Sequence, residues 1–320
     1  MRVAVLGTGR MGRARAGLLR AEEVLLAGHD PARTAAVAAE CGARAVTVEA
    51  ALASAPDGVV VASSTEHHAE QLLAAAELGV PVLCEKPIAL TVEDTRAAVE
   101  ALARSGAVVQ VGFQRRFDPG IAAARAVDVG TLYSLRITAR DAEPAEEHYI
   151  PGSGGMFRDM HVHDFDLARW MTGHEVATVY ATGAVRGFSR FARHGDVDTS
   201  AIVLTMDDGM PVLIEGSRHD PRGYDVRLEL LGSEDALVVG LDDRTPLTRL
   251  GAPPPADPWS SFVERFADAF ARETAAFVDL VRDGGDSPCP PESALEALRV
   301  AVACDLSRAE GRPVAMAEVT

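Results

Sequence analysis

The chain has 320 residues and a formal net charge of −16; hydrophobic residues make up 48% of it and aromatic residues 5%. This length predicts two domains with largely aliphatic cores, as in parallel sheets flanked by alanine-rich helices. The acidic balance argues against a nucleic-acid partner, because phosphate binding needs a concentrated basic surface. No run of about 18 apolar residues is free of charges, so no membrane span is expected.

Two further features bear on the expected location of the protein. The stretch from Met1 to Leu6 lacks the apolar region of an export signal and is better explained as a first strand. The four cysteines, Cys41, Cys84, Cys289 and Cys304, have no CxxC spacing. Reduced thiols in the cytoplasm are therefore expected.

Residues 1–117 alternate short β-rich runs with alanine-rich helical stretches, which indicates a parallel sheet with right-handed crossovers. The expected strands are Val3–Leu6, Val24–Ala27, Val59–Ala62, Val80–Cys84 and Val108–Gly112. The expected helices are Ala14–Arg20, Ala32–Cys41, Ala69–Leu78 and Val92–Arg104. Glycines that follow three of these helices are helix stop signals. We predict a doubly wound α/β domain over residues 1–117.

From residue 118 onward, strands follow one another with turn signals between them. The expected strands are Leu132–Ala139, Val176–Val185, Thr199–Met206, Pro211–Ser217, Tyr224–Leu231 and Ala236–Val239. Helices are expected near Ile121–Ala126, Asp159–Met171, Ser260–Val281 and Pro291–Glu310, with a proline-rich link at Ala252–Pro258. Residues 118–320 are therefore predicted to form an α+β domain with a large, mainly antiparallel open sheet. The last helix is a candidate to pack back on the first domain.

A glycine-rich turn directly after the first strand predicts dinucleotide binding. It reads Gly7-Thr8-Gly9-Arg10-Met11-Gly12 and opens a helix. In this GxGxxG spacing the first glycine makes the turn, the second lets the backbone approach a pyrophosphate, and the third allows close helix packing. The N-terminus of the helix then faces the anion.

The end of the second strand bears on the choice between NAD and NADP. It reads Ala27-Gly28-His29-Asp30-Pro31, and an acid about 20 residues beyond the glycines usually bonds the adenosine ribose. Asp30 is equally well placed to cap the helix that follows, because Pro31 suits the first helical position. If Asp30 only caps, then Gly28, His29 and Arg33 leave room for the 2′-phosphate of NADP. Both cofactors remain open.

Lys86 is the first candidate catalytic residue. It follows the strand Val80–Cys84 in the sequence Cys84-Glu85-Lys86-Pro87, and ligands of doubly wound sheets lie beyond the carboxyl ends of strands. A lysine there can hydrogen-bond a reacting hydroxyl and stabilise negative charge on its oxygen. An ordinary surface lysine is the plainer explanation, but Pro87 fixes the turn at this strand end.

A second polar cluster, GGMFRDMHVHDFD, occupies residues 154–166. If a helix begins near Asp159, then Asp159, His163 and Asp166 stand on one face. His163 is suited to remove the hydroxyl proton, with Asp159 orienting it. A helix-terminal acid and a structural histidine are the plainer explanations. A metal site is not expected, although His161 and Asp164 are also ligand types, because there is no HExxH or CxxC spacing.

Together these motifs resemble the Gfo/Idh/MocA oxidoreductases, and among them the bacterial inositol dehydrogenases. The similar segments are GTGRMG at 7–12, CEKP at 84–87, VGFQRRFDPG at 111–120, GGMFRDMHVHDFD at 154–166 and RGYDVRLELLGSED at 222–235. The resemblance implies an N-terminal Rossmann domain and an open sheet that mediates homo-oligomers, often tetramers. It also implies NAD- or NADP-dependent oxidation of a cyclitol hydroxyl to a ketone.

The resemblance also assigns residues to roles. The catalytic set matches Lys86, Asp159 and His163, and these residues also contact the substrate together with Arg116, Asp141, Asp166 and Tyr224. Besides the glycine turn, His29, Asp30, Arg33 and Lys86, the expected cofactor contacts are Ser63, Ser64, Thr65, His68, Glu85 and Gln114. Similar inositol dehydrogenases usually show an acid where Gly28 stands, which leaves the NAD preference open.

Other functions are compatible with parts of this pattern. The substrate could be an aminocyclitol, an aminoglycoside or another sugar, since the acidic stretch from Asp141 to Glu147 could receive ammonium groups, although a solvated loop explains it more simply. A non-catalytic dinucleotide-sensing regulator would keep the fold but would not need Lys86, Asp159 and His163 together. A structural interaction protein explains the open sheet but not the polar cluster.

Overall fold

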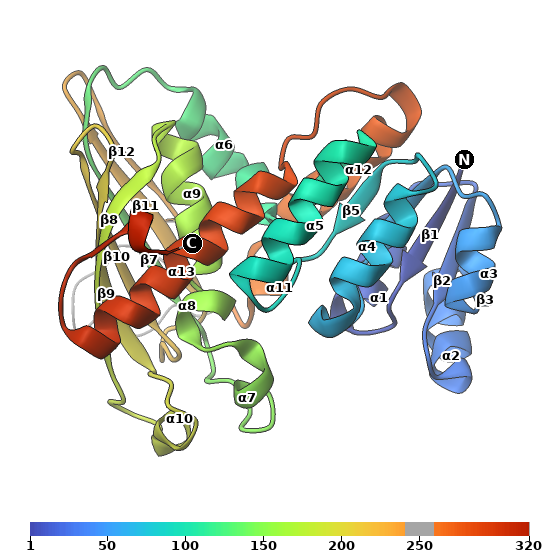
Figure 1. Cartoon of the computed structure of the whole chain (residues 1–320), viewed down its shortest axis with the longest axis horizontal. Helices are drawn as coiled ribbons and strands as arrows, with labels where there is room; N and C mark the ends of the chain where they lie inside the picture. The colour runs from blue at the N-terminus through green and yellow to red at the C-terminus, as the bar shows by residue number, and fades with distance from the viewer. Residues whose placement is uncertain (241–258, 320) are drawn as a thin grey trace. The chain divides into compact units, whose positions relative to one another are not determined.

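The computed structural model describes residues 1–240 and 259–319, and the chain divides into two compact units (Figure 1). The first unit comprises residues 1–114 and 268–296, and the second comprises residues 115–267 and 297–320. The proline-rich link expected at 252–258 lies outside the described residues. Within the described part of the chain, every helix is too short or too polar to cross a membrane.

A six-stranded parallel sheet with the order β3-β2-β1-β4-β5-β6 forms the centre of the first unit. The strands are β1 Arg2–Leu6, β2 Glu23–Ala27, β3 Arg44–Val46, β4 Gly58–Val61, β5 Val82–Cys84 and β6 Val109–Val111. Every residue of β4, β5 and β6 is buried, as expected of a sheet covered on both faces. The strand order reverses between β1 and β4, where doubly wound sheets bind their ligands. The predicted doubly wound fold is confirmed.

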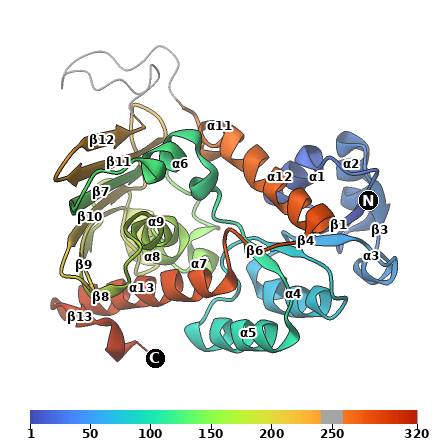
Figure 2. The same ribbon diagram turned by 90° about the horizontal axis from the view of Figure 1, so that it is seen from above.

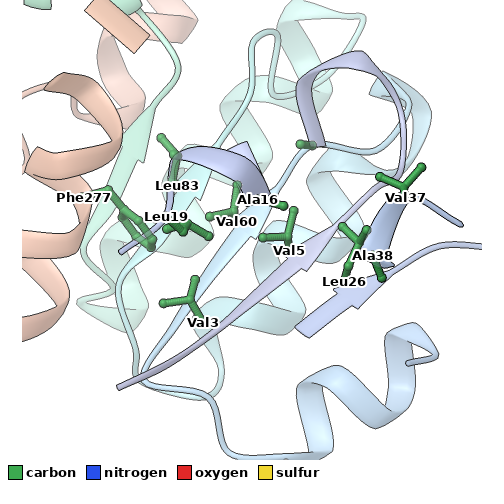
Figure 3. Packing of buried hydrophobic residues seen from close by; sticks show 11 residues of the cluster. Val3, Val5, Ala16, Leu19, Leu26, Val37, Ala38, Val60, Leu83 and Phe277 are labelled. Atoms are coloured by element: carbon green, nitrogen blue, oxygen red, sulfur yellow. The ribbon is translucent and has the colours of Figure 1, made fainter. Parts of the chain in front are cut away.

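Helices complete the first unit on both faces of this sheet. They are α1 Arg10–Leu18, α2 Pro31–Cys41, α3 Val48–Ala53, α4 His68–Ala76, α5 Val92–Ser105 and most of α12 Ala267–Asp283, with the 3-10 helix η1 Thr65–His67. In the core on one face, Val5 of β1, Leu19 directly after α1, Val37 of α2 and Phe277 of α12 pack together (Figure 3). A helix from far along the chain therefore completes the core of the first unit.

A seven-stranded sheet with the order β12-β11-β7-β10-β9-β8-β13 forms the second unit. The strands are β7 Leu132–Arg140, β8 Val176–Ala184, β9 Thr199–Met206, β10 Pro211–Ser217, β11 Asp225–Gly232, β12 Ala236–Val239 and β13 Val314–Ala315. Strands β7 and β10 pair in parallel, and the other pairs of the described sheet are antiparallel. The mainly antiparallel sheet predicted for this part of the chain is confirmed.

Helices cover one face of this second sheet. Figure 2 shows α9 Val162–Thr172 and α13 Pro291–Glu310 on the same side of the strands, and Ser307 of α13 accepts a hydrogen bond from the backbone of Ala181 in β8. The shorter helices of this unit are α6 Pro119–Ala126, α7 Ile150–Ser153, α8 Met156–Asp159, α10 Ser189–Arg193, α11 Phe262–Arg265 and the 3-10 helices η2 Gln114–Phe117 and η3 Met316–Glu318.

The opposite face of the second sheet carries exposed apolar side chains. Tyr180 of β8, Val203 of β9 and Leu213 of β10 stand opposite one another in register, and between 40% and 42% of each is exposed. The same row continues with Arg136 of β7 and Glu229 of β11, which form an ion pair of 3.4 Å. We call this face, defined by these five residues, the open face.

Candidate active site

The glycine turn after β1 has the geometry of a pyrophosphate cradle. Gly7 has a φ of +122°, and a Cβ there would overlap the carbonyl oxygen of Ala62. A Cβ on Gly12 would overlap the carbonyl oxygen of Gly7, so the third glycine permits close packing of α1. A Cβ on Gly9, which is the N-cap of α1, would meet no atom within 4 Å. The turn therefore offers open space beside backbone N–H groups at a helix N-terminus, which fits a dinucleotide.

The turn after β2 confirms that Asp30 caps a helix. Its Oδ1 accepts hydrogen bonds from the backbone N–H groups of Ala32 (2.9 Å) and Arg33 (3.1 Å) at the start of α2. A side chain at Gly28 would have to displace Thr8 and Thr34, whose atoms lie 2.7 and 2.9 Å from the position of a Cβ there. This packing explains why a glycine stands where similar enzymes were expected to carry an acid. The ribose contact of Asp30, and the roles of exposed His29 and Arg33, stay predictions.

The segment from the end of β4 to the start of α4 contains the expected cofactor residues Ser63, Ser64, Thr65 and His68. Ser63 donates a hydrogen bond to Gln71 (2.9 Å), and Ser64 donates one to Glu66 (3.2 Å). His68 is buried, and its ring nitrogens contact the carbonyl oxygens of Pro87 (2.7 Å) and Ser63 (3.1 Å). His68 therefore joins the turn after β4 to the turn that carries Lys86, whereas its predicted contact with the cofactor stays a prediction.

Lys86 lies two residues beyond the end of β5 and is half-buried. The preceding Glu85 is anchored by its backbone N–H, which donates to the carbonyl oxygen of Val61 at 2.9 Å. The Glu85 carboxylate points inward and accepts a hydrogen bond from Arg15. Lys86 is also the only lysine in the chain, because the other 30 of the 31 basic residues are arginines.

In the second unit, the single helix predicted from Asp159 is wrong. Asp159 ends α8, and α9 begins at Val162, so His163 and Asp166 share a helix that does not contain Asp159. The hydrogen-bond register changes between the two helices: the N–H of His161 bonds the carbonyl oxygen of Met156, five residues back, and that of Asp164 bonds His161, three residues back. This irregular turn separates Asp159 from the helical face proposed for it.

Arg218 brings together two of the predicted substrate residues. Its Nη1 donates to Oδ2 of Asp159 at 3.0 Å and to Oδ2 of Asp141 at 3.4 Å. The hydroxyl of Tyr149 donates a hydrogen bond to Oδ1 of Asp159 at 2.8 Å. Burial raises the pKa of the Asp141 carboxyl, and the charge of Arg218 opposes that rise. Neither Arg218 nor Tyr149 was selected from the sequence, because neither belongs to a motif and their bonds to Asp159 form only in the folded chain.

Arg116 and Asp166 form a second predicted pair, here in direct contact. Arg116 donates from Nε to Oδ2 of Asp166 at 2.9 Å and from Nη2 to Oδ1 at 2.5 Å. The guanidinium also lies 5.9 Å from the centre of the Trp170 ring. Burial raises the pKa of Asp166 despite this bonding. Gln114, the first residue of η2, is buried in the other unit, and half-buried His163 lies one turn before Asp166 on α9.

A buried polar chain supports Tyr224, the last predicted substrate residue. His161 contacts Ser200 through Nε2 and Asp164 through Nδ1, each at 2.7 Å. Asp164 forms an ion pair with Arg115, which also hydrogen-bonds Tyr224. Burial raises the pKa of Tyr224 to about 12. His161 and Asp164, which are metal-ligand types in the sequence, therefore bond to protein partners.

The predicted site residues thus fall into two groups. The cofactor residues and Lys86 belong to the first unit, and Asp159, His163 and the substrate residues belong to the second. A doubly wound domain with a pyrophosphate cradle is typical of dinucleotide-binding proteins, and a following domain rich in carboxylates and guanidinium groups is typical of dinucleotide-dependent oxidoreductases that act on polar substrates.

Comparison with known proteins gives the family. Residues 1–113 match the model of the oxidoreductase family with an NAD-binding Rossmann fold, GFO_IDH_MocA, and residues 122–238 match the GFO/IDH/MocA C-terminal domain. The inositol 2-dehydrogenase of Rhizobium meliloti is 35% identical over 99% of both chains. The chain belongs to the Gfo/Idh/MocA family, as its motifs led us to expect.

Solved structures agree with this assignment. A myo-inositol dehydrogenase from Corynebacterium glutamicum is 36% identical, with a TM-score of 0.90 over 98% of both chains. A scyllo-inositol dehydrogenase from Lactobacillus casei, with bound NAD(H) and scyllo-inositol, is 25% identical, with a TM-score of 0.88 over 99% of both chains.

Proposed function

We propose that the protein oxidises a secondary ring hydroxyl of a cyclitol to a ketone, with NAD as the hydride acceptor. Relatives that match nearly the whole chain are inositol dehydrogenases. The pyrophosphate cradle at Gly9 suits the cofactor, and the aspartates and arginines of the second unit suit a ring with many hydroxyl groups. Carboxylates accept hydrogen bonds from hydroxyls, and guanidinium groups donate to them.

The observation that carries the proposal is the identity of the residue after Glu85. At 30 positions this chain uses arginine as its basic residue, and at position 86 alone it uses lysine. Arginine does not release its proton in proteins, whereas lysine is a compact cation whose proton is exchangeable. A position beside the switch point of the sheet is where such a group can hold a reacting hydroxyl.

The residues would divide the reaction as follows. Lys86 hydrogen-bonds the reacting hydroxyl and stabilises the negative charge that develops on its oxygen. His163 takes the hydroxyl proton, and Asp159, held by Tyr149 and Arg218, orients the substrate or the histidine. The glycine turn from Gly7 to Gly12 would hold NAD, which would supply the hydride acceptor. Asp141, the Arg116–Asp166 pair and Tyr224 bind the remaining hydroxyls.

A spectrophotometric screen tests the activity and its alternatives together. myo-Inositol, scyllo-inositol, amino sugars and other polyols are offered with NAD and NADP side by side, and NADH formation with an inositol is the expected result. Faster reduction with amino sugars would instead identify an aminocyclitol or aminoglycoside enzyme. Binding of NAD without reduction in the presence of any polyol would contradict the proposal and favour a regulator.

The role of His163 has its own test. His163→Asn removes the proton acceptor while leaving the glycine turn intact, so turnover should fall by about 100-fold or more while the dissociation constant of NAD stays nearly unchanged. Equal losses in turnover and NAD affinity would contradict the assignment. His194→Asn, at an exposed position on the same unit, is the matched control.

We further propose that a second copy of the chain covers the open face. Tyr180, Val203 and Leu213 form an apolar row beside the Arg136–Glu229 ion pair. Under a two-fold axis an apolar centre meets itself and the neighbouring charges pair with their opposites, as in isologous interfaces. The homo-oligomer would be a dimer or tetramer. We place it in the cytosol, because all four cysteines are free thiols.

A further inference from the structure

Arg15 stands at the centre of a buried charge cluster that the proposed mechanism does not use. Its side chain has no exposed surface. Nε donates to Oε1 of Glu85 at 2.8 Å, Nη2 to Oε2 of Glu273 at 2.5 Å, and Nη1 to the hydroxyl of Thr274 at 3.1 Å. The guanidinium lies 5.2 Å from the centre of the Phe270 ring. All of these residues belong to the first unit.

The cluster is built for a guanidinium with two carboxylates. Burial alone would lower the pKa of Arg15, but attraction to Glu273 and then to Glu85 raises it, so Arg15 is held as a cation. The Nη2 atom also lies 2.7 Å from Glu85, so one arginine bridges both acids. A lysine in this place would lack the planar guanidinium that donates to Glu85 after β5 and to Glu273 and Thr274 of α12 at the same time.

The cluster connects the cofactor turn to the turn that carries Lys86. Arg15 is on α1, which begins within the glycine turn directly after Gly9, and Glu85 is the immediate neighbour of Lys86. Gly112 leaves space for the Glu85 carboxylate, because a Cβ at this position would lie 2.7 Å from Oε2 of Glu85. From α12, the carbonyl oxygen of Glu273 accepts a hydrogen bond from Gln110 of β6 at 3.0 Å.

We propose that Arg15 is a positioning residue for Lys86: by clamping Glu85 between α1 and α12, it sets where the ammonium stands relative to the cofactor cradle. The inference rests on the proposed function for the catalytic role of Lys86. Displacement of a reacting group by about 1 Å can lower a rate by about 100-fold. A clamp on the preceding residue is therefore sufficient to control turnover.

The test uses a double variant that removes the clamp and keeps the net charge of the cluster. The wild-type cluster has one cation and two carboxylates, and Arg15→Gln with Glu273→Gln leaves one carboxylate, so both carry a charge of −1. The turnover number per folded site should fall about 10- to 100-fold, with the dissociation constant of NAD nearly unchanged. A second variant, Gly112→Ala, displaces Glu85 from its other side without altering any charge.

Because Lys86 is the only lysine, protein labelled with 15N-lysine gives one backbone amide signal and one side-chain signal. Both signals should move in the double variant and in Gly112→Ala. They should stay in place in Arg2→Gln, a control arginine that pairs with Glu23 and Ser54 at the other end of β1. If Arg15 had only a structural role, all three variants would have lower thermal stability, and the Lys86 signals would not move.

The result that overturns the inference is a double variant and a Gly112→Ala variant that both keep the wild-type Lys86 signals and the wild-type turnover per folded site. If the double variant does not fold, Gly112→Ala decides by the same readouts. If none of the polyols supports NAD reduction by the wild-type protein, the proposed function fails. The two Lys86 signals then still decide whether Arg15 positions this residue.

Discussion

Asp164 offers a stability prediction whose size follows from burial in the second unit. Its side chain has no exposed surface, and it pairs with Arg115, of which 3% is exposed, and with fully buried His161. These partners hold the pKa of Asp164 below its usual value although burial acts in the opposite direction. Asp164→Asn would leave the Arg115 cation buried without its counter-charge, which typically costs about 3–5 kcal/mol.

Intrinsic fluorescence can follow this loss in the second unit alone. Both tryptophans of the chain, Trp170 and Trp259, lie in that unit, so a urea titration followed by tryptophan emission reports its unfolding rather than that of the Rossmann domain. The midpoint of the Asp164→Asn variant should move to clearly lower urea with an unchanged slope.

A second variant separates the charge effect from simple loss of packing. Asp164→Asn combined with Arg115→Met removes both charges and should recover most of the stability, because a buried ion pair can often be replaced by apolar groups without loss. Glu147→Gln, which breaks the exposed ion pair with Arg193 in the same unit, should have no measurable effect. An Asp164→Asn variant within about 1 kcal/mol of wild type, or a double variant no better than the single one, would refute the reasoning.

Further predictions concern the cofactor, pH and assembly. Gly9→Val should leave the melting temperature nearly unchanged, because its side chain enters open space, but should weaken NAD binding about tenfold or more in a fluorescence titration; unchanged affinity would exclude the cradle. Asp30→Ala should weaken NAD binding by more than the roughly 1 kcal/mol of a lost helix cap; a smaller effect would make Asp30 structural. Burial alone would raise the pKa of Asp198, but hydrogen bonds from three backbone N–H groups lower it. The stability advantage of wild type over Asp198→Asn should therefore exist above pH ~4 and disappear as pH falls through the folded-state pKa; a constant difference in urea midpoints would contradict it. Val203→Lys should lower the mass seen by light scattering, and an unchanged mass would exclude the open face as the interface.

The elements that the sequence predicted well have local signals at both ends. Helix α13 begins at Pro291 and ends just before Gly311, and its expected bounds agree with the structure. Strands β9, β10 and β12 also have their expected bounds, since each is a short run rich in apolar or β-branched residues that lies between turn residues. Strand β3 was missed because it has only three residues, and α3 because its six residues give little periodicity, although Thr47 caps it.

The parts of the site that the sequence did not predict depend on tertiary contacts. Periodicity runs without interruption through residues 156–172, and the break after Asp159 arises where His161 turns inward to Asp164 and Ser200. Arg15 resembles neighbouring Arg13 in sequence, yet Arg15 is fully buried and Arg13 is exposed. The single lysine can be read directly from the sequence, but a count that combines lysine with arginine does not reveal it.

The discontinuous make-up of the first unit has a consequence for biosynthesis. Glu273 lies 258 positions after Arg15, and Phe277 of the core comes later still. When the Rossmann strands leave the ribosome, Arg15 has Glu85 within reach but neither of its α12 partners. N-terminal domains usually begin to fold during synthesis, but this one cannot close its core until nearly the whole polypeptide has been translated. A nascent chain arrested before α12 should therefore be captured by chaperones or cleaved by proteases.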